Sequence, residues 1–541
     1  MTSNIRILDC TLRDGAYIVD AKFGEPAIKG IINKLQNAGI EIIECGWLKD
    51  SEHVNGTSFY HVPSDLNLYL NEKRKDVIYT VMIDWDRYSL DNLPVNDGKS
   101  IDAIRVVFPH GKHMEGIEVG KCIKEKGYKV YLQAANTLAY SIEDLKSLAQ
   151  CVNELKPEGL SVVDTFGAMY QEDLERILEI LDERLNEEIQ LGFHSHNNQQ
   201  MAFANSIFFV RLLSETKRKI IIDSSLCGMG RGAGNATTEL MVNYLNTKYD
   251  HNYDLDAIMD AIDIYMSGFE EKYNWGYSTP YYIAGMYCCH VNNIKYLQDN
   301  HRTNAKDMRN IIDSLSPDDR KKYNYSLLEE KYIENQGRKI DDSEAVALLR
   351  ERFDINNDNS KKILLIAPGK SVLLQQRRIK EFIDKEKPIT IAVNAILPEY
   401  ETDYLFITNS ARYDYARITY SNQFDRINKI LLSNIKREGE EKEYIVNFNR
   451  AIKRGWKYFD NAVICALRLM DRLGAKDIYI AGFDGFKDKY NESYADESLP
   501  TLNPGVKWND INEEIKNMFK EIKSITKLNI SFLTESIYEE D

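Results

Sequence analysis

The chain has 541 residues, of which 43% are hydrophobic and 28% are charged, a composition typical of a soluble globular protein. This length predicts two or three domains. The formal net charge of −15 argues against nonspecific binding to nucleic acid or anionic membranes, which needs clustered lysine and arginine. The eight cysteines form no CxxC pair, and we find neither a secretory leader pattern nor an apolar run long enough for a membrane span. We therefore expect a cytoplasmic protein.

From the start of the chain, short apolar runs alternate with amphipathic stretches. The expected strands are residues 5–8, 40–44, 77–82, 103–107, 129–134, 160–163, 189–193 and 220–223, and the expected helices include 26–38, 117–126, 142–155, 172–185 and 201–214. Strand and helix in repeated alternation predict parallel strands with crossover helices. The repeat fits a (β/α)8 TIM barrel, whose usual length is about 250 residues, with a doubly wound open sheet as the alternative.

Beyond the barrel, helical patterns at 238–246 and 255–267 lead to an aromatic stretch at 275–282 and a polar helical stretch at about 300–352. Asparagine-rich residues 356–360 favour turns and mark a boundary. A second α/β pattern begins at Lys362, with expected strands at 363–367, 389–393, 404–407 and 478–481 and a helix at 461–473. We expect a barrel at 1–290, a helical extension or linker at 291–355, and a smaller Rossmann-like domain at 356–541.

Two motifs at expected strand ends contain metal-ligating residue types. Asp14 follows the first expected strand and stands beside Arg13, a pair that on its own is commonly a structural ion pair. His194 and His196 lie two residues apart after strand 189–193, and such residues of an extended segment point to the same side. Together with Asp14 they form a two-His, one-carboxylate set, which leaves coordination positions open for a substrate.

Two further motifs also follow expected strands. The segment GMGRGAGNA at 228–236 contains four glycines within residues 228–234, which permit left-handed backbone and close approach to a ligand. A tight loop without a ligand is the alternative. The segment VDTFGA at 163–168 contains Asp164, which suits a helix N-cap as well as a substrate contact.

The segments LRDG, HxHNN, GxGxGAGNA and DTFGAM resemble the motifs of the DRE-type TIM-barrel metallolyases, the superfamily of HMG-CoA lyase. The superfamily also includes isopropylmalate and homocitrate synthases and 4-hydroxy-2-oxovalerate aldolase. The resemblance covers roughly residues 4–290. It is greatest to the 4-hydroxy-2-oxovalerate aldolase branch, partly because AGMY at 284–287 is similar to that branch's AGVY segment.

The resemblance implies a metal site and a substrate site. Asp14, His194 and His196 would be the metal ligands, with Asn235 as a fourth ligand or a close neighbour of the ligands. The set suits Mn²⁺, our first expectation, as well as Mg²⁺, Zn²⁺, Fe²⁺ or Co²⁺. In the substrate site, Arg13 would bind the keto acid and stabilise its enolate, and Glu44 would support Arg13. Thr165, Asp164 and His110 would contact the substrate. Tyr287 would lie near the reacting hydroxyl, with Tyr281 or Tyr282 in its place if the alignment is shifted.

One position departs from the family pattern. Three residues after the metal Asp, the aldolases usually have a His that acts as the base on the substrate hydroxyl, whereas this chain has Tyr17. A tyrosine with an ordinary pKa near 10 is a poor base at neutral pH. Either the metal or Arg13 lowers the pKa of Tyr17, or His110 or His113 serves as the base, or the reaction differs.

The predicted function is a metal-dependent class II aldolase that joins or separates a pyruvate enolate and an aldehyde, with a 4-hydroxy-2-keto acid as substrate. A Claisen-type synthase using an acyl-CoA and a 2-keto acid on the same metal is the alternative, and a catalytically inactive scaffold barrel is the third. Aldolases of this branch often partner an aldehyde dehydrogenase, and we expect a homo-oligomer.

In the C-terminal part, APGKS at 367–371 follows an expected strand and suggests phosphate binding, although the spacing of a P-loop is absent. Together with VNA at 393–395 and IAGFD at 480–484, this segment weakly resembles bacterial sialyltransferase-like and motility-associated glycosyltransferase-like domains. That likeness implies a sugar nucleotide as ligand, a bifunctional chain and a role in cell-surface glycan biosynthesis. An α/β domain used for assembly is the alternative.

Overall fold

The structure is a computed structural model that describes residues 4–301, 303–336, 340–355, 361–435, 443–453, 456, 461–487, 491–500 and 508–539. The chain forms two compact units, residues 1–294 with 317–322, and residues 295–316 with 323–541. No helix within the described ranges combines the length and the apolar character needed to cross a bilayer.

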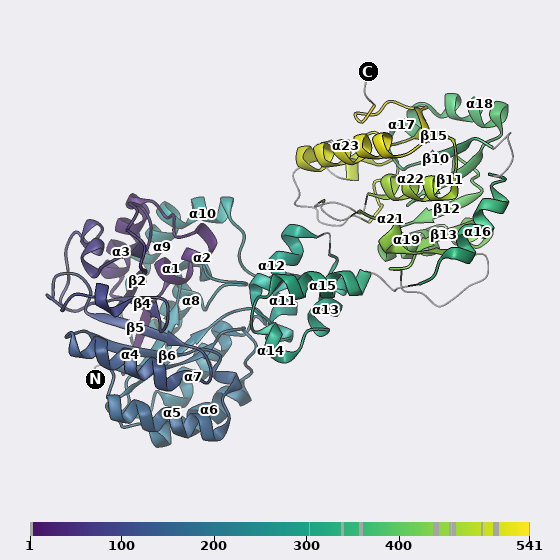
Figure 1. The fold of residues 1–541 in the computed structure, drawn as a ribbon. Helices are drawn as coiled ribbons and strands as arrows, with labels where there is room; N and C mark the ends of the chain where they lie inside the picture. Colours follow the sequence, from purple (N-terminus) through teal and green to yellow (C-terminus); the bar gives the residue numbers. More distant parts are fainter. Residues whose placement is uncertain are drawn as a thin grey trace. The chain divides into compact units, whose positions relative to one another are not determined.

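The first unit is a closed parallel barrel, as the sequence predicts (Figure 1). Its strands are β1 (Ile5–Asp9), β2 (Ile42–Leu48), β4 (Ile78–Asp84), β5 (Ala103–Phe108), β6 (Lys129–Ala134), β7 (Gly159–Asp164), β8 (Gln190–Ser195) and β9 (Ile220–Ser224). The barrel closes because β1 pairs in parallel with both β2 and β9. A short strand, β3 (Phe59–Tyr60), extends the sheet beside β2. This closure excludes the open-sheet alternative.

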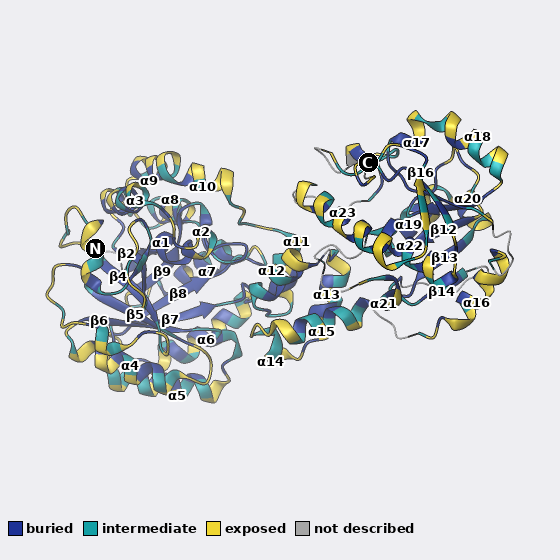
Figure 2. Ribbon diagram, turned by 45° about the horizontal axis from the view of Figure 1, so that its top comes forward, coloured by how far each residue is buried: buried dark blue, intermediate teal, exposed yellow. Residues whose placement is uncertain are grey.

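Amphipathic helices surround the strands: α3 (Glu25–Ala38), α4 (His113–Glu125), α5 (Ile142–Leu155), α6 (Gln171–Arg184), α7 (Ala202–Leu213) and α8 (Thr238–Lys248). Helix α5 shows how the sequence sets their bounds. It begins after Ser141, whose side chain accepts a hydrogen bond from Asp144 N in a capping box. Leu145, Leu148 and Val152 are buried at helical spacing. Figure 2 shows the same division, with exposed residues on the outer faces of these helices and buried strands inside.

The segment after the barrel strands is helical. The expected helix at 255–267 is divided into α9 (Leu255–Ala261), a π-helical turn at Ile262–Met266 and α10 (Ser267–Lys272). The helices that follow are α11 (Thr279–Met286), α12 (Val291–Asn300), α13 (Ala305–Asp313), α14 (Pro317–Arg320), α15 (Tyr325–Gln336) and α16 (Ser343–Arg352). The expected turn segment 356–360 lies outside the described residues. Helical structure in this region is confirmed, whereas the bounds 291 and 355 stay a prediction.

The second unit contains a separate parallel sheet in the order β14-β13-β12-β11-β10-β15-β16. Its strands are β10 (Ile363–Ile366), β11 (Ile389–Val393), β12 (Tyr404–Ile407), β13 (Asn428–Leu432), β14 (Glu443–Val446), β15 (Asp477–Ala481) and β16 (Asn529–Phe532). The strand order reverses between β10 and β15. In doubly wound sheets of this kind, ligands bind beyond the carboxyl ends of the strands at such a reversal.

Candidate metal centre and substrate pocket

Asp14 is buried at the carboxyl end of the barrel. It ends α1 (Thr11–Asp14), a single helical turn that directly follows β1. Its Oδ1 accepts from Arg13 Nη1 at 2.5 Å, and its Oδ2 accepts from Asn235 Nδ2 at 2.9 Å. Burial alone raises the pKa of Asp14, but Arg13 and the two nearby histidines lower it well below its usual range. The carboxylate is therefore ionised, as a metal ligand must be.

His194 and His196 lie at the end of β8 with their side chains toward Asp14. One potential ligand atom from each of the three residues lies within 4.8 Å of the others, and His196 Nδ1 is 3.9 Å from Asp14 Oδ2. Burial lowers the pKa of His196 to about 3, so its imidazole is neutral and has a free lone pair.

Two buried acceptors test whether the site suits a cation. Neither His196 Nδ1 nor Asn235 Oδ1 has a hydrogen-bond partner within the described part of the chain. Buried polar atoms are normally satisfied, and a divalent cation would satisfy these two together with the Asp14 carboxylate. The ligand set predicted from the sequence is thus brought together, and it fits a metal ion.

The backbone of the glycine-rich loop at 228–236 passes close to the Asp14 carboxylate and the Asn235 side chain. A Cβ atom on Gly230 would lie 2.4 Å from Asp14 Oδ2 and 2.4 Å from Asn235 Nδ2. Gly234 has a φ of +84°, and its carbonyl accepts from Asn197 N at 2.8 Å. The loop therefore places Asn235 beside Asp14, and glycine is required where the loop passes the carboxylate.

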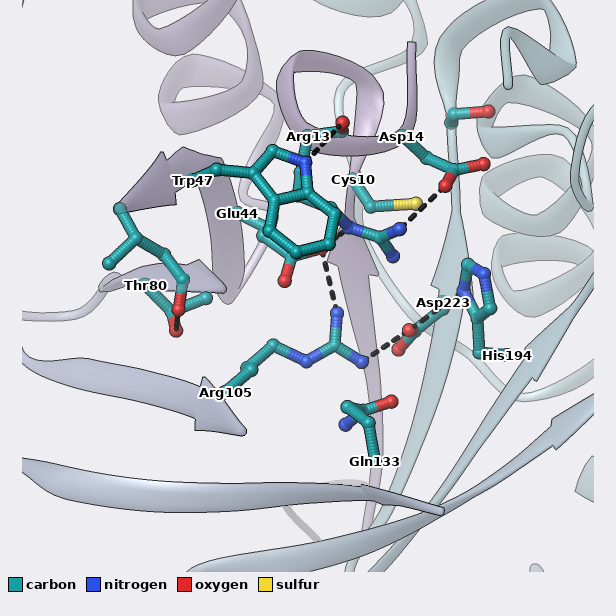
Figure 3. Close-up of polar contacts among 12 residues, drawn as sticks. Cys10, Arg13, Asp14, Glu44, Trp47, Thr80, Arg105, Gln133, His194 and Asp223 are labelled. Atoms are coloured by element: carbon teal, nitrogen blue, oxygen red, sulfur yellow. Dashed lines mark hydrogen bonds and ion pairs between the residues drawn. The ribbon is translucent and has the colours of Figure 1, made fainter. Parts of the chain in front are cut away.

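Asp14 and His194 are connected through a buried network of alternating charges (Figure 3). Glu44 Oε2 accepts from Arg13 Nε at 2.7 Å and from Arg105 Nη1 at 2.8 Å. Arg105 also donates from Nη2 to Asp223, whose Oδ2 lies 3.1 Å from His194 Nδ1. Because Glu44 and Asp223 are each paired with arginine, the network holds Arg13 and His194 in fixed positions.

A pocket of about 1040 Å³, measured with the part open to solvent, lies over this network. Of the residues predicted from the sequence, it is lined by Arg13, Asp14, Tyr17, Thr165, His194 and His196. The other polar and aromatic side chains of its wall include Trp47, Asp84, Trp85, Arg87, Lys112, Gln133 and Arg231. The candidate metal ligands and the predicted substrate residues Arg13 and Thr165 therefore face one space.

Tyr17 lines this pocket from α2 (Ala16–Val19). Its ring lies edge-on to Trp47, and the Arg231 guanidinium carbon is 3.9 Å from its ring centroid. Although 43% of Tyr17 is exposed, desolvation by the surrounding atoms raises its pKa more than Arg231 and Arg13 lower it. The protein groups around Tyr17 therefore do not convert it into a base for neutral pH.

Three other predicted site residues lie away from the pocket lining. Asp164 accepts from Ala168 N at 2.9 Å and Met169 N at 3.1 Å in the loop after β7. It is not a helix N-cap, because α6 begins at Gln171 with Tyr170 at the N-cap position. His110 lies 3.2 Å from Asp144 Oδ2. Tyr287 follows α11, with Arg320 over its ring at 4.8 Å. Their substrate roles stay predictions.

Arg105, Asp223 and Arg231 are site residues that the sequence argument did not single out. Arg105 and Asp223 are charged residues within or at the end of apolar strands, β5 and β9, and each is 1% exposed. A charged residue in a buried strand needs a partner of opposite charge. A charged residue within an apolar strand is therefore the sequence feature that would have identified Arg105 and Asp223.

Comparisons with known proteins find relatives of part of the chain. Residues 114–264 match the HMGL-like family. The chain is 26% identical over 265 residues to oxaloacetate decarboxylase of Mycobacterium tuberculosis, covering 47% of this chain and 74% of that protein. It is 27% identical over 266 residues to 4-hydroxy-2-oxovalerate aldolase of Geobacillus genomosp. 3, covering 48% of this chain and 76% of that protein.

Among solved structures, the N-terminal domain of a putative aldolase from Bacteroides vulgatus is 26% identical, with a TM-score of 0.48 over 54% of this chain and 95% of that one. The weak likeness of the C-terminal part to sialyltransferase-like and motility-associated glycosyltransferase-like domains is not confirmed by these comparisons. Part of the barrel thus matches the HMGL-like family model, and the chain is an enzyme of the lyase and aldolase type.

Proposed function

We propose that the barrel is a divalent-metal-dependent aldolase that cleaves or forms the C3–C4 bond of a 4-hydroxy-2-keto acid, with pyruvate and an aldehyde as the other reactants. The observation that carries this proposal is the convergence of Asp14, His194 and His196 on one point of a pocket that also contains Arg13. The relatives named 4-hydroxy-2-oxovalerate aldolase support the substrate class.

Asp14, His194 and His196 would hold the cation, with Asn235 Oδ1 beside them. We propose Mn²⁺ as that cation. When bound, a divalent ion supplies Lewis acidity that stabilises negative charge on the oxygens of a keto acid. The neutral His196 imidazole and the ionised Asp14 carboxylate are the protonation states that metal binding needs.

Arg13 is positioned to bind the keto acid. Its Nε and Nη1 are engaged by Glu44 and Asp14, whereas Nη2 makes no hydrogen bond to any described residue and the side chain lines the pocket. Because the guanidinium is fixed on two sides, its remaining N–H groups form a preorganised donor for developing negative charge. Glu44 and Arg105 would act through Arg13, as positioning residues.

Thr165 is suited to hold the substrate carboxylate. Its Oγ1 accepts from Asn136 N at 2.6 Å, which leaves the hydroxyl hydrogen to donate to a bound oxyanion in the pocket. Tyr17 stands at the same pocket with a raised pKa, so at neutral pH it is a hydrogen-bond donor. We propose that Tyr17 donates to the oxygen of the aldehyde in the condensing direction.

A second candidate function is decarboxylation of a 2-keto diacid at the same site, and the oxaloacetate decarboxylase relative favours it. Cleavage of a carboxylate from C3 leaves the same pyruvate enolate as aldol cleavage, so Arg13 and Thr165 would serve both reactions. The Claisen-type acyl-CoA synthase remains a third candidate.

Product analysis separates these candidates. Purified full-length protein with added Mn²⁺ is assayed for pyruvate with a panel of 4-hydroxy-2-keto acids and with oxaloacetate, and for thiol release with acetyl-CoA and 2-keto acids. We expect pyruvate plus an aldehyde, with loss of activity in His194→Ala and retention in the control His251→Ala. Carbon dioxide release from oxaloacetate alone, or thiol release alone, would replace the proposal with the corresponding alternative.

The sequence also predicts a sugar nucleotide at the C-terminal domain, a role in surface-glycan biosynthesis, a cytoplasmic location and a homo-oligomer. These stay predictions. The aldolase proposal depends on none of them.

A further inference from the structure

The second unit has a pocket of its own at the carboxyl end of its sheet. Its volume is about 790 Å³, measured with the part open to solvent. Residues after β10, β11 and β15 form its floor, and the first residues of α19 (Ser410–Thr419) and α22 (Ala462–Leu473) form part of its wall. The pocket thus lies where the strand order reverses, and the aldolase proposal assigns it nothing.

Arg412 is a buried cation in this wall. The residue is 6% exposed, and its Nη1 atom has no hydrogen-bond partner among the described residues. Its guanidinium carbon lies 4.8 Å from the centroid of the Tyr494 ring, which holds the side chain in place. Burial of an unpaired charge is costly, so the position calls for a negatively charged partner.

The start of α22 adds donors to the same pocket. Asn461 caps this helix by accepting from Ile464 N at 3.2 Å. The amides of Ala462 and Val463, which line the pocket, have no hydrogen-bond acceptor within the described ranges. Free amides at a helix start, together with the helix dipole, favour an anion.

On the floor of the pocket, a carboxylate is held in a fixed orientation. Asp484 follows β15 and accepts from both the backbone amide and the hydroxyl of Ser371, with Ser371 N at 2.8 Å. Gly369 permits this contact, because a Cβ there would lie 2.6 Å from Asp484 Cγ. Asp484 retains lone pairs that can accept hydrogen bonds from ligand hydroxyl groups.

We propose that this pocket binds a phosphate ester of a small hydroxylated molecule. The phosphate is bound by Arg412 and the first amides of α22, and hydroxyl groups of the same ligand donate to Asp484. Phosphate matches the donors because guanidinium and helix-start amides are its commonest partners in proteins. Phe483 and Tyr538, which also line the pocket, supply apolar surface for the rest of the ligand.

Isothermal titration of the full chain tests the phosphate subsite, with inorganic pyrophosphate and a sugar phosphate as probes and acetate at equal ionic strength as the reference anion. We expect saturable binding of the phosphate probes, weakened about tenfold or more by Arg412→Gln, and no saturable binding of acetate. Arg417→Gln is the matched control, since Arg417 is exposed on the same helix, 3.8 Å from Asp414. Absence of phosphate binding, or equal affinity in Arg412→Gln and wild type, would overturn the proposal.

A second variant keeps the test independent of the stability of Arg412→Gln. Ala462→Pro removes one amide of the pocket at the first helical position, where proline is well tolerated. We expect weaker pyrophosphate binding with an unchanged melting temperature in the absence of the probe. Unchanged binding in this variant, or pyrophosphate-induced protection from hydrogen exchange that excludes residues 461–465, would contradict the proposed site. Aldolase activity is expected to be unaltered in all three variants, so failure here is distinct from failure of the aldolase proposal.

Discussion

Arg105 and Glu44 form an ion pair of 2.8 Å inside the barrel, where the two side chains are 1% and 0% exposed. Glu44 uses the same oxygen to accept from Arg13, and Arg105 also contacts Asp223 beside His194. Loss of Arg105 would therefore affect both ends of the candidate metal site, although Arg105 itself is outside the pocket lining.

Arg105→Met is expected to destabilise the barrel by about 3–5 kcal/mol, because Glu44 loses one of two arginine partners and Asp223 loses the arginine with which it pairs. Denaturant unfolding followed by circular dichroism measures the change. Arg184→Met is the control, since Arg184 is 51% exposed and lies 3.9 Å from Glu183, and we expect an effect within about 0.5 kcal/mol. Equal stability of the two variants would show that the network contributes little.

Gly230→Ala tests the close approach of the glycine-rich loop. The new methyl group would lie 2.4 Å from Asp14 Oδ2 and must displace Asp14 or Asn235. We expect at least a tenfold loss of metal affinity with a folded barrel, measured by titration with Mn²⁺. Gly268→Ala has no heavy atom within 4 Å of the added Cβ, so this control should bind metal as wild type does.

Tyr17→Phe tests the hydroxyl that replaces the histidine of related aldolases. The variant keeps the ring beside Trp47 and under Arg231 but removes the proposed donor to the aldehyde oxygen. We expect kcat to fall about 10²-fold with little change in KM for the keto acid. Tyr170→Phe, at a residue that is 54% exposed, serves as the control. A kcat equal to wild type in Tyr17→Phe would remove Tyr17 from the mechanism.

The buried carboxyl group of Glu239 is expected to make the free energy of unfolding depend on pH. Burial raises the pKa of its carboxyl from 4.5 to about 7 in the folded chain. Between these values the folded protein holds a proton that the unfolded chain has lost, so stability falls as pH rises from about 4.5 to about 7. Glu239→Gln should be more stable than wild type at pH 8 by about 1–3 kcal/mol and equal to it at pH 4. A constant difference at both pH values would contradict this assignment.

The barrel strands were predictable because each is a short apolar run followed by an amphipathic helix, and strand 129–134 was placed at its observed bounds. The convergence of Asp14, His194 and His196 was predictable for a related reason, since side chains that follow barrel strand ends meet at one face. In the second unit, the sequence analysis predicts no strand at Asn428–Leu432, Glu443–Val446 or Asn529–Phe532. All three are short strands that begin with a polar residue, and no periodic pattern distinguishes them from loops.

The sequence could not show which charged residues meet inside the fold. Arg105 and Asp223 are 118 residues apart, and only barrel closure brings them together. The sequence also could not show that the carboxylate of Asp164 accepts from the amides of Ala168 and Met169 in the loop after β7, because those contacts depend on how the loop folds back. Arg412 lies in helix α19, and nothing in the sequence distinguishes a buried arginine of a helix from an exposed one.

Metal content is the most direct test of the barrel site. Full-length wild type, dialysed against Mn²⁺ and then buffer, is expected to retain about one divalent cation per chain by elemental analysis. His196→Ala is expected to lose that cation while its circular dichroism spectrum is unchanged, and pyruvate release should fall with it. Retention of a full equivalent in His196→Ala, or aldol cleavage by metal-free protein, would contradict a catalytic cation held by Asp14, His194 and His196.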